Sequence, residues 1–464
     1  MRARSLEDII QAQPEFARYL YNRDSAPHAS RRPGASPVPA EWTNWFEEQQ
    51  AWRTTAVLFD QSHHMAELLV TGPDAMKMLN YLASNTFKGF TPNKAKQFAP
   101  LSYDGYVIGD VIMFYHAENE FNLVGRAPTV NWVQFHAETG GFNVQVRRDD
   151  RSPSNPKGAA IVRQHYRYQV QGPNAWKLLE KLNGGAIPDI KFFNMDYINI
   201  GGQKVRALRH GMAGAPGLEL WGPYADREKV KDVILAAGEE FGLVQVGARA
   251  YATNTLESGW IPSPLPAVYS GEKMKKYREW LPASGYEATC SIAGSFVSKN
   301  IEDYYSTPYE LGYGIMVKYD HDFIGREALE KRANEPQRKK VTFAWNAEDV
   351  ARVMTSILGK GDHYKYIELP LSNYGSSSFD AIVKNGKTVG LSMFSGISYN
   401  ERSMLSLGVV DPDVQIGEEL TLVWGEENGG TKKSTVEPHK QTEIRVTVSP
   451  VPYAEVARTT YRPK

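Results

Sequence analysis

The sequence predicts an α+β fold in which a duplicated α/β core is followed by an antiparallel β-barrel or sandwich. The first indication is an internal repeat: the pattern of residues 70–77 recurs at residues 170–177, with Gly-Pro, then Asp or Asn, Ala and Lys at matching positions. The second is the alternation of short strand and helix patterns before residue 330, which is typical of α/β units. The third is a series of strand patterns after residue 340, which indicates an all-β unit.

Each copy of the repeat reads as a strand, a turn and a helix. An apolar strand ends at Gly-Pro, and Asp74 or Asn174 then stands where its side chain can cap the helix that follows. Two leucines follow three residues apart in both predicted helices, as expected for an apolar helix face. We interpret the two copies as a duplicated strand–helix module.

The second copy leads into a hairpin and a longer helix. Residues 197–206 form two strand-like halves around a Gly-Gly pair, which is typical of a two-residue hairpin turn. A helix is then expected to begin near Asp226, with apolar residues at helical spacing, and to end at Gly242. This alternation of strands and helices favours an α+β domain.

A domain boundary is expected near residue 340. Residues 327–340 are charged, and they separate the α/β patterns from the strand patterns that follow. We therefore assign residues 1–340 to a core domain of two duplicated, intertwined subdomains, and residues 341–464 to a C-terminal β-domain. Strands of that domain are expected at 341–345, 420–424 and 444–448, with a hairpin through Asn385-Gly386.

Charge and cysteine content exclude several classes of function. Lys plus Arg and Asp plus Glu both number 53, so the net charge is zero and no overall field attracts nucleic acid or an anionic membrane. The single cysteine, Cys290, excludes an internal disulfide framework and fits a reducing compartment. The amino terminus lacks a signal-peptide core, and no transmembrane run is found. A cytoplasmic protein with small-molecule partners is expected.

The most informative segment is residues 209–223, where three glycines interrupt regular structure before an apolar strand. Glu219 lies inside that strand. Burying an unpaired carboxylate is costly, so either a donor-rich ligand or a basic neighbour is expected beside it. Tyr251, Glu257 and Trp260 follow within ten positions of one another. Together these residues predict a pocket for a flat, polar, hydrogen-bonding molecule.

Several familiar motifs are absent from the sequence: a Walker A loop, a dinucleotide fingerprint after a strand, a Gly-x-Ser-x-Gly elbow and a His-Glu-x-x-His helix. His63 and His64 are adjacent, and neighbouring residues of a strand point to opposite faces, so they are not expected to chelate one ion. No metal is predicted. One of the two is expected to be either a neutral hydrogen-bonding imidazole in a pocket or a structural histidine.

A family resemblance is carried by residues 211–220, 256–259 and 322–329, the last reading Asp-Phe-Ile-Gly-Arg-Glu-Ala-Leu. These segments resemble the folate-binding aminomethyltransferases, whose best-known member is the glycine cleavage T-protein. The resemblance covers nearly the whole chain and implies a duplicated α/β core around tetrahydrofolate with a carboxy-terminal β-barrel. Within that family, the tetrahydrofolate-dependent aryl O-demethylases are the most similar, through residues 58–65, 124–128, 209–223, 259–266 and 424–430.

The resemblance implies transfer of a methyl group from an aromatic methoxy acid to N5 of tetrahydrofolate, the methyl acceptor. The leaving group is a phenoxide, so negative charge on the phenolic oxygen needs stabilisation. By resemblance, Tyr251 is the catalytic tyrosine that donates a hydrogen bond or a proton to that oxygen. His64 is a substrate-side imidazole, either catalytic or only positioning. Arg126 matches the residue that clamps the benzoate carboxylate, a planar geometry that suits arginine.

The resemblance also assigns the residues that hold the cofactor. Glu219 is expected to accept hydrogen bonds from the amino-pyrimidine edge of the pterin, whose adjacent N–H groups fit one carboxylate. Gln169, just before the second Gly-Pro turn, is expected to meet the amide edge of the pterin, and Trp260 is expected to supply an aromatic wall.

Two departures from the family pattern bear on the substrate. The glycine cleavage enzyme has an Asp-Asp pair where this chain has Gly109-Asp110, which argues against an aminomethyl-lipoate substrate. The vanillate-acting enzymes carry a pocket tyrosine near the amino terminus, and a gapless count places Ala35 there. A smaller residue leaves room for a second methoxy group, so syringate is favoured over vanillate or 3-O-methylgallate.

Two other functions stay open at this point. One is a folate-dependent demethylase or aminomethyltransferase that acts on an amine or a sulfonium substrate, for which Arg126 would still hold a carboxylate. The other is a non-catalytic folate-binding maintenance protein. Such proteins carry a Lys-Gly-Cys-Tyr type of motif, whereas Cys290 lies in Ala-Thr-Cys-Ser-Ile, which argues against this alternative.

Overall fold

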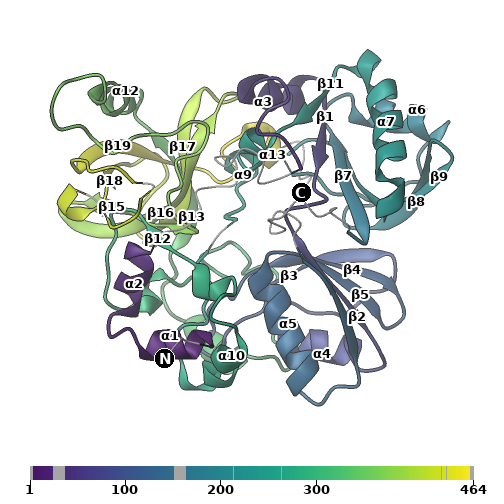
Figure 1. The fold of residues 1–464 in the computed structure, drawn as a ribbon, viewed down its shortest axis with the longest axis horizontal. Helices are drawn as coiled ribbons and strands as arrows, with labels where there is room; N and C mark the ends of the chain where they lie inside the picture. Colours follow the sequence, from purple (N-terminus) through teal and green to yellow (C-terminus); the bar gives the residue numbers. More distant parts are fainter. Residues whose placement is uncertain are drawn as a thin grey trace.

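Two α/β bodies and a β-barrel surround the centre of the molecule in the residues that the structure describes (Figure 1). The computed structural model describes residues 4–459, apart from residues 24–36, 151–162, 213, 263, 430 and 435. In Figure 1 the barrel lies on the left, and the two sheets of the core lie on the right, one above the other. The predicted fold class, an α+β core followed by an antiparallel barrel, is confirmed.

The upper α/β body is built on a six-stranded sheet. Its strands are β1 (Ala56–Asp60), β7 (His165–Gln171), β8 (Met195–Ile200), β9 (Gln203–Leu208), β10 (Gly217–Pro223) and β11 (Leu243–Val246). Their order is β11-β1-β7-β10-β9-β8, and only the β1–β11 pair is parallel. The helices α3 (Trp45–Thr54), α6 (Ala175–Asn183) and α7 (Arg227–Gly238) pack against these strands.

The predicted hairpin and helix of this body are confirmed. Strands β8 and β9 pair across Gly201 and Gly202, which both have positive φ. Helix α7 starts one residue after Asp226, and a short 3-10 turn prolongs it to Phe241. Gly242 ends it with φ of +66°, a left-handed conformation that glycine adopts without steric cost.

The lower α/β body is built on a five-stranded antiparallel sheet. Its strands are β2 (Ala66–Thr71), β3 (Lys94–Phe98), β4 (Val111–Ala117), β5 (Glu120–Gly125) and β6 (Gln145–Asp149), in the order β3-β4-β5-β2-β6. The helices α4 (Ala75–Leu82) and α5 (Ala127–Thr139) pack together, and α5 also contacts β2, β5 and β6. Pro128 stands in the first turn of α5, where its missing N–H group costs nothing.

The two copies of the repeat form the same local structure in different sheets. Gly72 and Gly172 have φ of +123° and +129°, and a Cβ on either would lie 2.7 or 2.6 Å from a backbone oxygen of a neighbouring segment. A side chain is therefore excluded at both turns. The predicted capping bonds of Asp74 and Asn174 are wrong. Both residues occupy N-cap positions, but Asp74 accepts from the Asn143 N–H at 2.8 Å, and Asn174 donates to a distant carbonyl at 3.0 Å.

Short elements connect the sheets to the barrel. Helix α1 begins with a capping box, in which Ser5 and Asp8 each accept from the other's backbone N–H. Helix α8 carries Tyr251 at its last position, and α9 follows three residues later. The connecting elements are α1 (Leu6–Gln11), α2 (Phe16–Asn22), α8 (Ala248–Tyr251), α9 (Asn254–Ser258), α10 (Lys275–Trp280), β12 (Ile292–Ala293), α11 (Arg326–Arg332) and β14 (Ser377–Ser378).

The sequence left open whether the C-terminal strands form a barrel or a sandwich, and the structure shows that they close into a barrel. They are β13 (Lys339–Trp345), β15 (Asp380–Lys384), β16 (Lys387–Ser398), β17 (Ser403–Val410), β18 (Glu419–Trp424) and β19 (Thr442–Ser449), in the order β13-β17-β16-β15-β18-β19. Helix α12 (Ala347–Ser356) lies outside the barrel, and α13 (Glu455–Thr459) follows the last barrel strand, β19. The predicted hairpin turns at Asn385 and Gly386, with φ of +52° and +76°. The domain boundary at 340/341 stays a prediction.

A buried polar cluster ties the barrel to the core. The Glu257 carboxylate on α9 accepts hydrogen bonds from Trp52 Nε1 at 3.0 Å and from Arg53 Nη2 at 2.8 Å, both on α3. It also accepts from Ser398 Oγ at 2.7 Å and from Asn400 Nδ2 at 3.0 Å, at the end of β16. Four donors satisfy the carboxylate, so its burial fixes α9 between helix α3 and the barrel.

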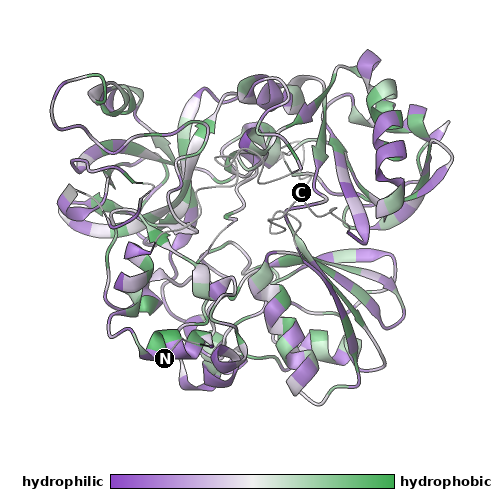
Figure 2. Ribbon diagram, viewed as in Figure 1, coloured by the Kyte–Doolittle hydropathy of each residue, from purple (hydrophilic) through white to green (hydrophobic). Residues whose placement is uncertain are grey.

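The hydropathy of the elements matches this arrangement. Figure 2 shows both hydrophilic and hydrophobic residues on the helices that cover the sheets, α5 and α7 among them, as expected for helices with one buried face. Among the described residues, no helix is both long and apolar enough to cross a membrane.

Candidate active site

The three bodies enclose one large cavity of about 1750 Å³. Glu219 on β10, Phe114 on β4, Tyr251 on α8 and Phe394 on β16 all line it, so each body contributes to its wall. Of the six residues predicted for the site, five line this cavity: His64, Arg126, Glu219, Tyr251 and Trp260.

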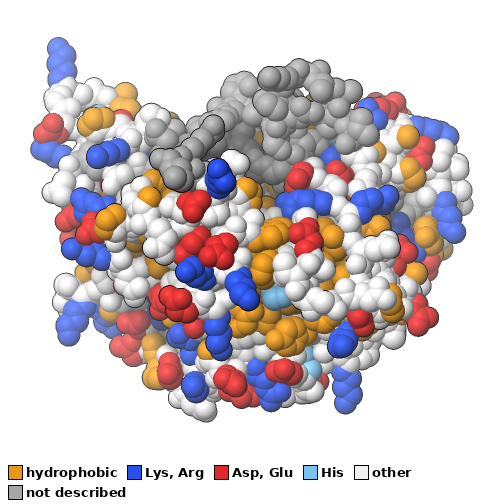
Figure 3. Space-filling view, turned by 60° about the horizontal axis from the view of Figure 1, so that its bottom comes forward, with side chains coloured by type: hydrophobic (Ala, Val, Ile, Leu, Met, Phe, Trp, Pro, Cys, Tyr) orange, Lys and Arg blue, Asp and Glu red, His pale blue; other side chains and the backbone are white. Residues whose placement is uncertain are grey.

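The cavity has apolar residues at its opening. Phe192 and Ile315 line it although 56% and 84% of their surfaces are exposed, so both lie where it meets solvent. Figure 3 shows one face of the molecule on which hydrophobic side chains gather near the middle, with charged side chains around them. A large cavity that combines apolar and polar side chains is a suitable small-molecule site.

Tyr251 and His64 meet inside the cavity. The Tyr251 hydroxyl lies 3.0 Å from His64 Nε2, and Gln61 Nε2 donates to it at 3.4 Å. The Tyr251 ring packs edge-on against Phe59, which fixes its direction. Burial, reinforced by the nearby carboxylate of Glu219, raises the pKa of Tyr251 above its usual value. The phenol therefore stays protonated at neutral pH and can act as a hydrogen-bond or proton donor.

His63 and His64 point to different surroundings, as expected, but the reason differs from the one that the sequence suggested. The expectation that they lie on a strand is wrong, because both belong to a turn that follows β1. His63 is buried with its ring against Tyr224, whereas His64 is exposed to the cavity and directed at Tyr251. The turn thus presents one imidazole to the cavity and packs the other against the core.

A buried ion-pair cluster lies beneath the cavity. Arg167 Nε donates to Glu67 Oε1 at 2.7 Å, and Arg167 Nη1 donates to Glu219 Oε1 at 3.0 Å. The guanidinium lies 4.8 Å from the centroid of the Phe114 ring and 5.3 Å from that of Trp221, on the two sheets. Of the two partners that the sequence left open for Glu219, a basic neighbour is therefore present.

The pKa values of the two carboxyl groups in this cluster shift in opposite directions. Burial alone would raise the pKa of Glu67, but Arg167 and His165 outweigh it and hold that pKa well below its usual range. Burial raises the pKa of Glu219, and Arg167 offsets this only in part. Among the described residues, Glu219 Oε2 makes only a 3.8 Å approach to His210 Nδ1. Glu219 therefore faces the cavity with an oxygen that can accept from a ligand.

Gln169 lies one layer behind the cavity wall. It is fully buried, with its Oε1 accepting from Gln61 Nε2 at 3.0 Å and its Nε2 donating to the His210 carbonyl at 2.9 Å. Gln61, which sequence reasoning missed, lines the cavity in its place. Direct contact between Gln169 and a cofactor would require the side chain to exchange these bonds.

Trp260, which lines the cavity, forms part of a hydrogen-bonded group. Its Nε1 lies 3.1 Å from Asp110 Oδ2 and 3.0 Å from the Tyr313 hydroxyl, and Gln97 Nε2 donates to the same Asp110 oxygen at 2.7 Å. Burial raises the pKa of Asp110 above its usual value. The single aspartate of the Gly109-Asp110 pair thus fixes the orientation of the indole in the wall.

Arg126 lies at another part of the cavity, at the junction of β5 and α5. It is exposed, and its Nη1 donates to the Tyr286 hydroxyl at 3.3 Å. Its remaining N–H groups can bind an anionic group that enters the cavity. Arg148, which was not predicted, also lines the cavity, but its Nη1 already donates to Asn131 and Gln134 at 2.7 and 3.0 Å.

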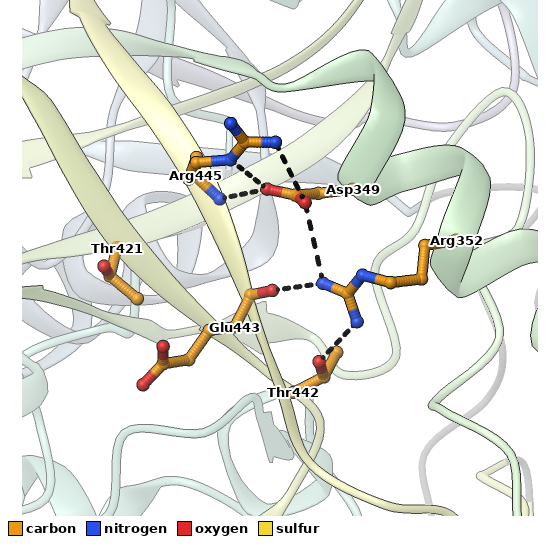
Figure 4. Close-up of a pocket in the computed structure, with 6 residues that line it drawn as sticks. All are labelled: Asp349, Arg352, Thr421, Thr442, Glu443 and Arg445. Atoms are coloured by element: carbon orange, nitrogen blue, oxygen red, sulfur yellow. Dashed lines mark hydrogen bonds and ion pairs between the residues drawn. The ribbon is translucent and has the colours of Figure 1, made fainter.

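A second cavity of about 430 Å³ lies on the outer side of the barrel, between α12 and β19 (Figure 4). Its two arginines already donate to other residues that line it. Arg445 Nε donates to Asp349 at 2.9 Å, and Arg352 donates to Thr442 Oγ1 at 2.9 Å and to the Glu443 carbonyl at 2.7 Å. The chemistry of the central cavity makes that cavity the better candidate site.

The fold matches that of a solved aminomethyltransferase structure. The structure is similar to the crystal structure of glycine cleavage system aminomethyltransferase T from Bartonella henselae, with a TM-score of 0.60 and 18% sequence identity, covering 90% of this chain and 92% of that chain. This likeness shows the shared fold.

Sequence comparison places the chain in a family. Residues 26–263 match the GCVT N-terminal domain, and the chain belongs to this family. It is 53% identical over 460 residues to the syringate O-demethylase of Sphingobium sp. (strain NBRC 103272 / SYK-6), covering 99% of this chain and 98% of that protein. It is 29% identical to the sesamin methylene transferase of Sinomonas sp. (strain No.22), covering 91% of both chains. An aminomethyltransferase of Clostridium botulinum (strain Okra / Type B1) is 29% identical, covering 76% of this chain and 77% of that protein.

Proposed function

We propose that the protein is a tetrahydrofolate-dependent O-demethylase of methoxylated aromatic acids, with syringate as the favoured substrate. The observation that carries this proposal is the protonated Tyr251 hydroxyl, directed into a cavity beside His64 and held near the buried carboxylate of Glu219. The 53% identity to a syringate O-demethylase along almost the full length supports the same chemistry.

Tyr251 would serve as the proton donor. During methyl transfer the bond between the methyl carbon and the phenolic oxygen breaks, and the methyl group forms a bond to N5 of tetrahydrofolate. N5 loses a proton and the phenolic oxygen gains one, so atoms and charge balance without an oxidant. The raised pKa of Tyr251 keeps its proton available for the oxygen as negative charge develops there. His64, 3.0 Å away, can position the substrate or return the proton.

Glu219 and Trp260 would hold the methyl acceptor. The Oε2 atom of Glu219 faces the cavity, and its carboxylate suits the adjacent N–H donors of an amino-pyrimidine ring. The indole of Trp260 is fixed by Asp110 and offers an aromatic wall. Gln169 would support the cofactor through Gln61. Arg126 would bind the carboxylate of the aromatic acid, for which its planar donor geometry is suited.

Ala35, on which the preference for syringate rests, lies outside the described residues, so that preference stays a prediction. A cytoplasmic location is part of the proposal, since Cys290 is a buried free thiol. The proposed partners are the aromatic acid and tetrahydrofolate alone, and the reaction fits the breakdown of lignin-derived methoxy aromatics.

The test is a direct assay with purified protein, tetrahydrofolate and separate methoxybenzoates, followed by chromatography. Syringate, and more weakly vanillate or 3-O-methylgallate, should lose a methyl group as 5-methyltetrahydrofolate forms in equal amount. If none of these acids is demethylated but an amine or sulfonium compound is, the protein is a different folate-dependent transferase. If the protein binds tetrahydrofolate without turning over any of them, the maintenance-protein alternative holds.

A further inference from the structure

The chain returns from the barrel to the core after its last barrel strand. Residues 450–459, here called the C-terminal strap, follow β19 and include helix α13. In Figure 1 the strap lies beside α9 near the centre of the molecule, away from the outer side of the barrel. Side chains of the strap are buried there, since Ala454 and Ala457 are 0% and 2% exposed.

The strap approaches two glycines so closely that neither could carry a side chain. A Cβ on Gly259 would lie 2.6 Å from Val451 Cγ2 and 3.1 Å from Pro452 Cα. A Cβ on Gly214 would lie 2.8 Å from Ala457 Cβ. Both glycines have left-handed backbones, with φ of +75° and +67°. The strap thus packs directly on the backbone of two segments that are 45 residues apart in sequence.

Each segment adjoins a residue that the proposed function assigns to the cofactor, Trp260 in one case and Gln169 in the other. Gly259 precedes Trp260 and itself lines the cavity. Gly214 belongs to the loop between β9 and β10. Two residues earlier in that loop, the sulfur atom of Met212 lies 3.6 Å from the Tyr251 hydroxyl oxygen. The same loop provides the His210 carbonyl that holds Gln169. One short segment therefore packs on two chain segments that both contribute residues to the cavity lining.

The strap is held in a fixed shape by its own hydrogen bonds. Arg458 Nη1 donates to the carbonyl oxygens of Pro452 and Tyr453, at 2.7 and 2.6 Å. These two bonds join the end of α13 to the segment that covers Gly259. Movement of either contact is thereby coupled to the other.

We propose that the C-terminal strap is a positioning element that holds residues 209–212 and 214–216 and the Gly259-Trp260 segment in place around the methyl acceptor. Ala457, Val451 and Arg458 are its positioning residues, and none of them lines the cavity. The inference that the strap positions the methyl acceptor rests on the proposed function. The inference that the strap supports the loop does not depend on it.

The test compares Arg458→Ala with Glu455→Ala, a change on the exposed side of the same helix. Amide hydrogen exchange is measured by mass spectrometry without ligand, in peptides that cover residues 209–216 and 252–262. Loss of the two Arg458 bonds should speed exchange in both peptides about tenfold, while Glu455→Ala leaves it unchanged. The KM for tetrahydrofolate should rise about tenfold in Arg458→Ala, with the KM for syringate within about twofold of wild type.

Ala457→Val gives an independent perturbation if Arg458→Ala fails to fold, because the added methyl groups press on Gly214 directly. It should produce the same split between the two KM values. Unchanged exchange in both peptides, or an equal rise in both KM values, would overturn the proposal. If exchange speeds up as expected but wild-type protein demethylates no aromatic acid, the strap supports the loop and the proposed function is what fails.

Discussion

Replacing Tyr251 by phenylalanine tests the proposed chemistry most directly, because it removes the hydroxyl and keeps the ring. The hydroxyl lies 3.0 Å from His64 Nε2 and accepts from Gln61 at 3.4 Å, while the ring stays packed against Phe59. A neutral hydrogen bond contributes about 1 kcal/mol to stability, and the longer contact contributes less. The free energy of unfolding should therefore fall by only about 1 kcal/mol, and the variant should fold.

The effect on turnover should be far larger than the effect on stability. General acid catalysis typically contributes about 10²- to 10⁴-fold, so kcat of Tyr251→Phe should fall by that factor. The KM values for syringate and tetrahydrofolate should stay within about threefold of wild type, because the hydroxyl acts mainly on charge that develops in the transition state. Initial rates measured by chromatography give both parameters. Tyr319→Phe is the matched control, since it removes a 2.7 Å bond to Tyr309 outside the cavity and should leave kcat unchanged.

The pH dependence gives a second readout of the same residue. The raised pKa of Tyr251 means that the protonated form persists above pH 10, the usual value for tyrosine. Wild-type kcat should therefore show no loss from this group between pH 7 and pH 10. Two results would refute the reasoning: a kcat for Tyr251→Phe within tenfold of wild type, or an alkaline loss below pH 10 that disappears in this variant.

Three further predictions concern the other groups. Arg126→Ala should raise the KM for aromatic acids about 10- to 100-fold by removing charged hydrogen bonds, without changing the rate with a neutral methoxyphenol; equal harm to both would contradict a carboxylate clamp. Glu219→Gln should raise the KM for tetrahydrofolate about tenfold, whereas Glu67→Gln, which also loses Arg167 but lies outside the cavity wall, should not; similar KM values in the two variants would argue against the cofactor role. Burial raises the pKa of Asp380 to about 7, so the folded state binds a proton that the unfolded state releases near pH 4, and stability falls as pH rises between these values. Asp380→Asn keeps the acceptor for the Ser295 N–H and should be more stable than wild type by about 1 to 4 kcal/mol at pH 8 but not at pH 4, measured by urea unfolding at both pH values.

Local sequence patterns predicted the elements, and the resemblance predicted how they assemble. Glycines mark the turns at 72, 172 and 242 because left-handed or crowded backbone positions exclude side chains, and this requirement is visible in the sequence. The capping bonds of Asp74 and Asn174 could not be predicted in the same way. Their side chains bond to segments far away in the chain, and such contacts depend on the tertiary fold.

Five of the six residues that the resemblance named line the cavity, and their roles stay predictions. Residues that act through other residues were missed. Arg167 was overlooked, although a signal for it is present in β7. His165, Arg167, Gln169 and Gln171 alternate with the apolar Tyr166, Tyr168 and Val170, so one face of this central strand is polar. A buried strand with a polar face indicates a site or a buried network. The polar cluster around Glu257 gave no such signal, because its donors come from two segments, residues 52–53 and 398–400, that lie far from Glu257 in the sequence.

The repeat explains why the buried charge cluster lies where the two sheets meet. The two copies are offset by 100 residues, so Glu67 and Arg167 occupy equivalent positions, and they form an ion pair at 2.7 Å. Contact between equivalent positions is what modules related by a local two-fold axis produce. The pair is self-compensating, and Glu219 adds a second carboxylate to the same guanidinium at 3.0 Å. Both buried carboxylates share the Arg167 guanidinium, but Glu67 also contacts His165 Nδ1 at 3.1 Å. Glu219, whose pKa is raised, is therefore the one that needs another donor. Of Glu67, Arg167 and Glu219, only Glu219 lines the cavity. A ligand rich in N–H donors can therefore donate the additional hydrogen bonds that the Glu219 carboxylate needs.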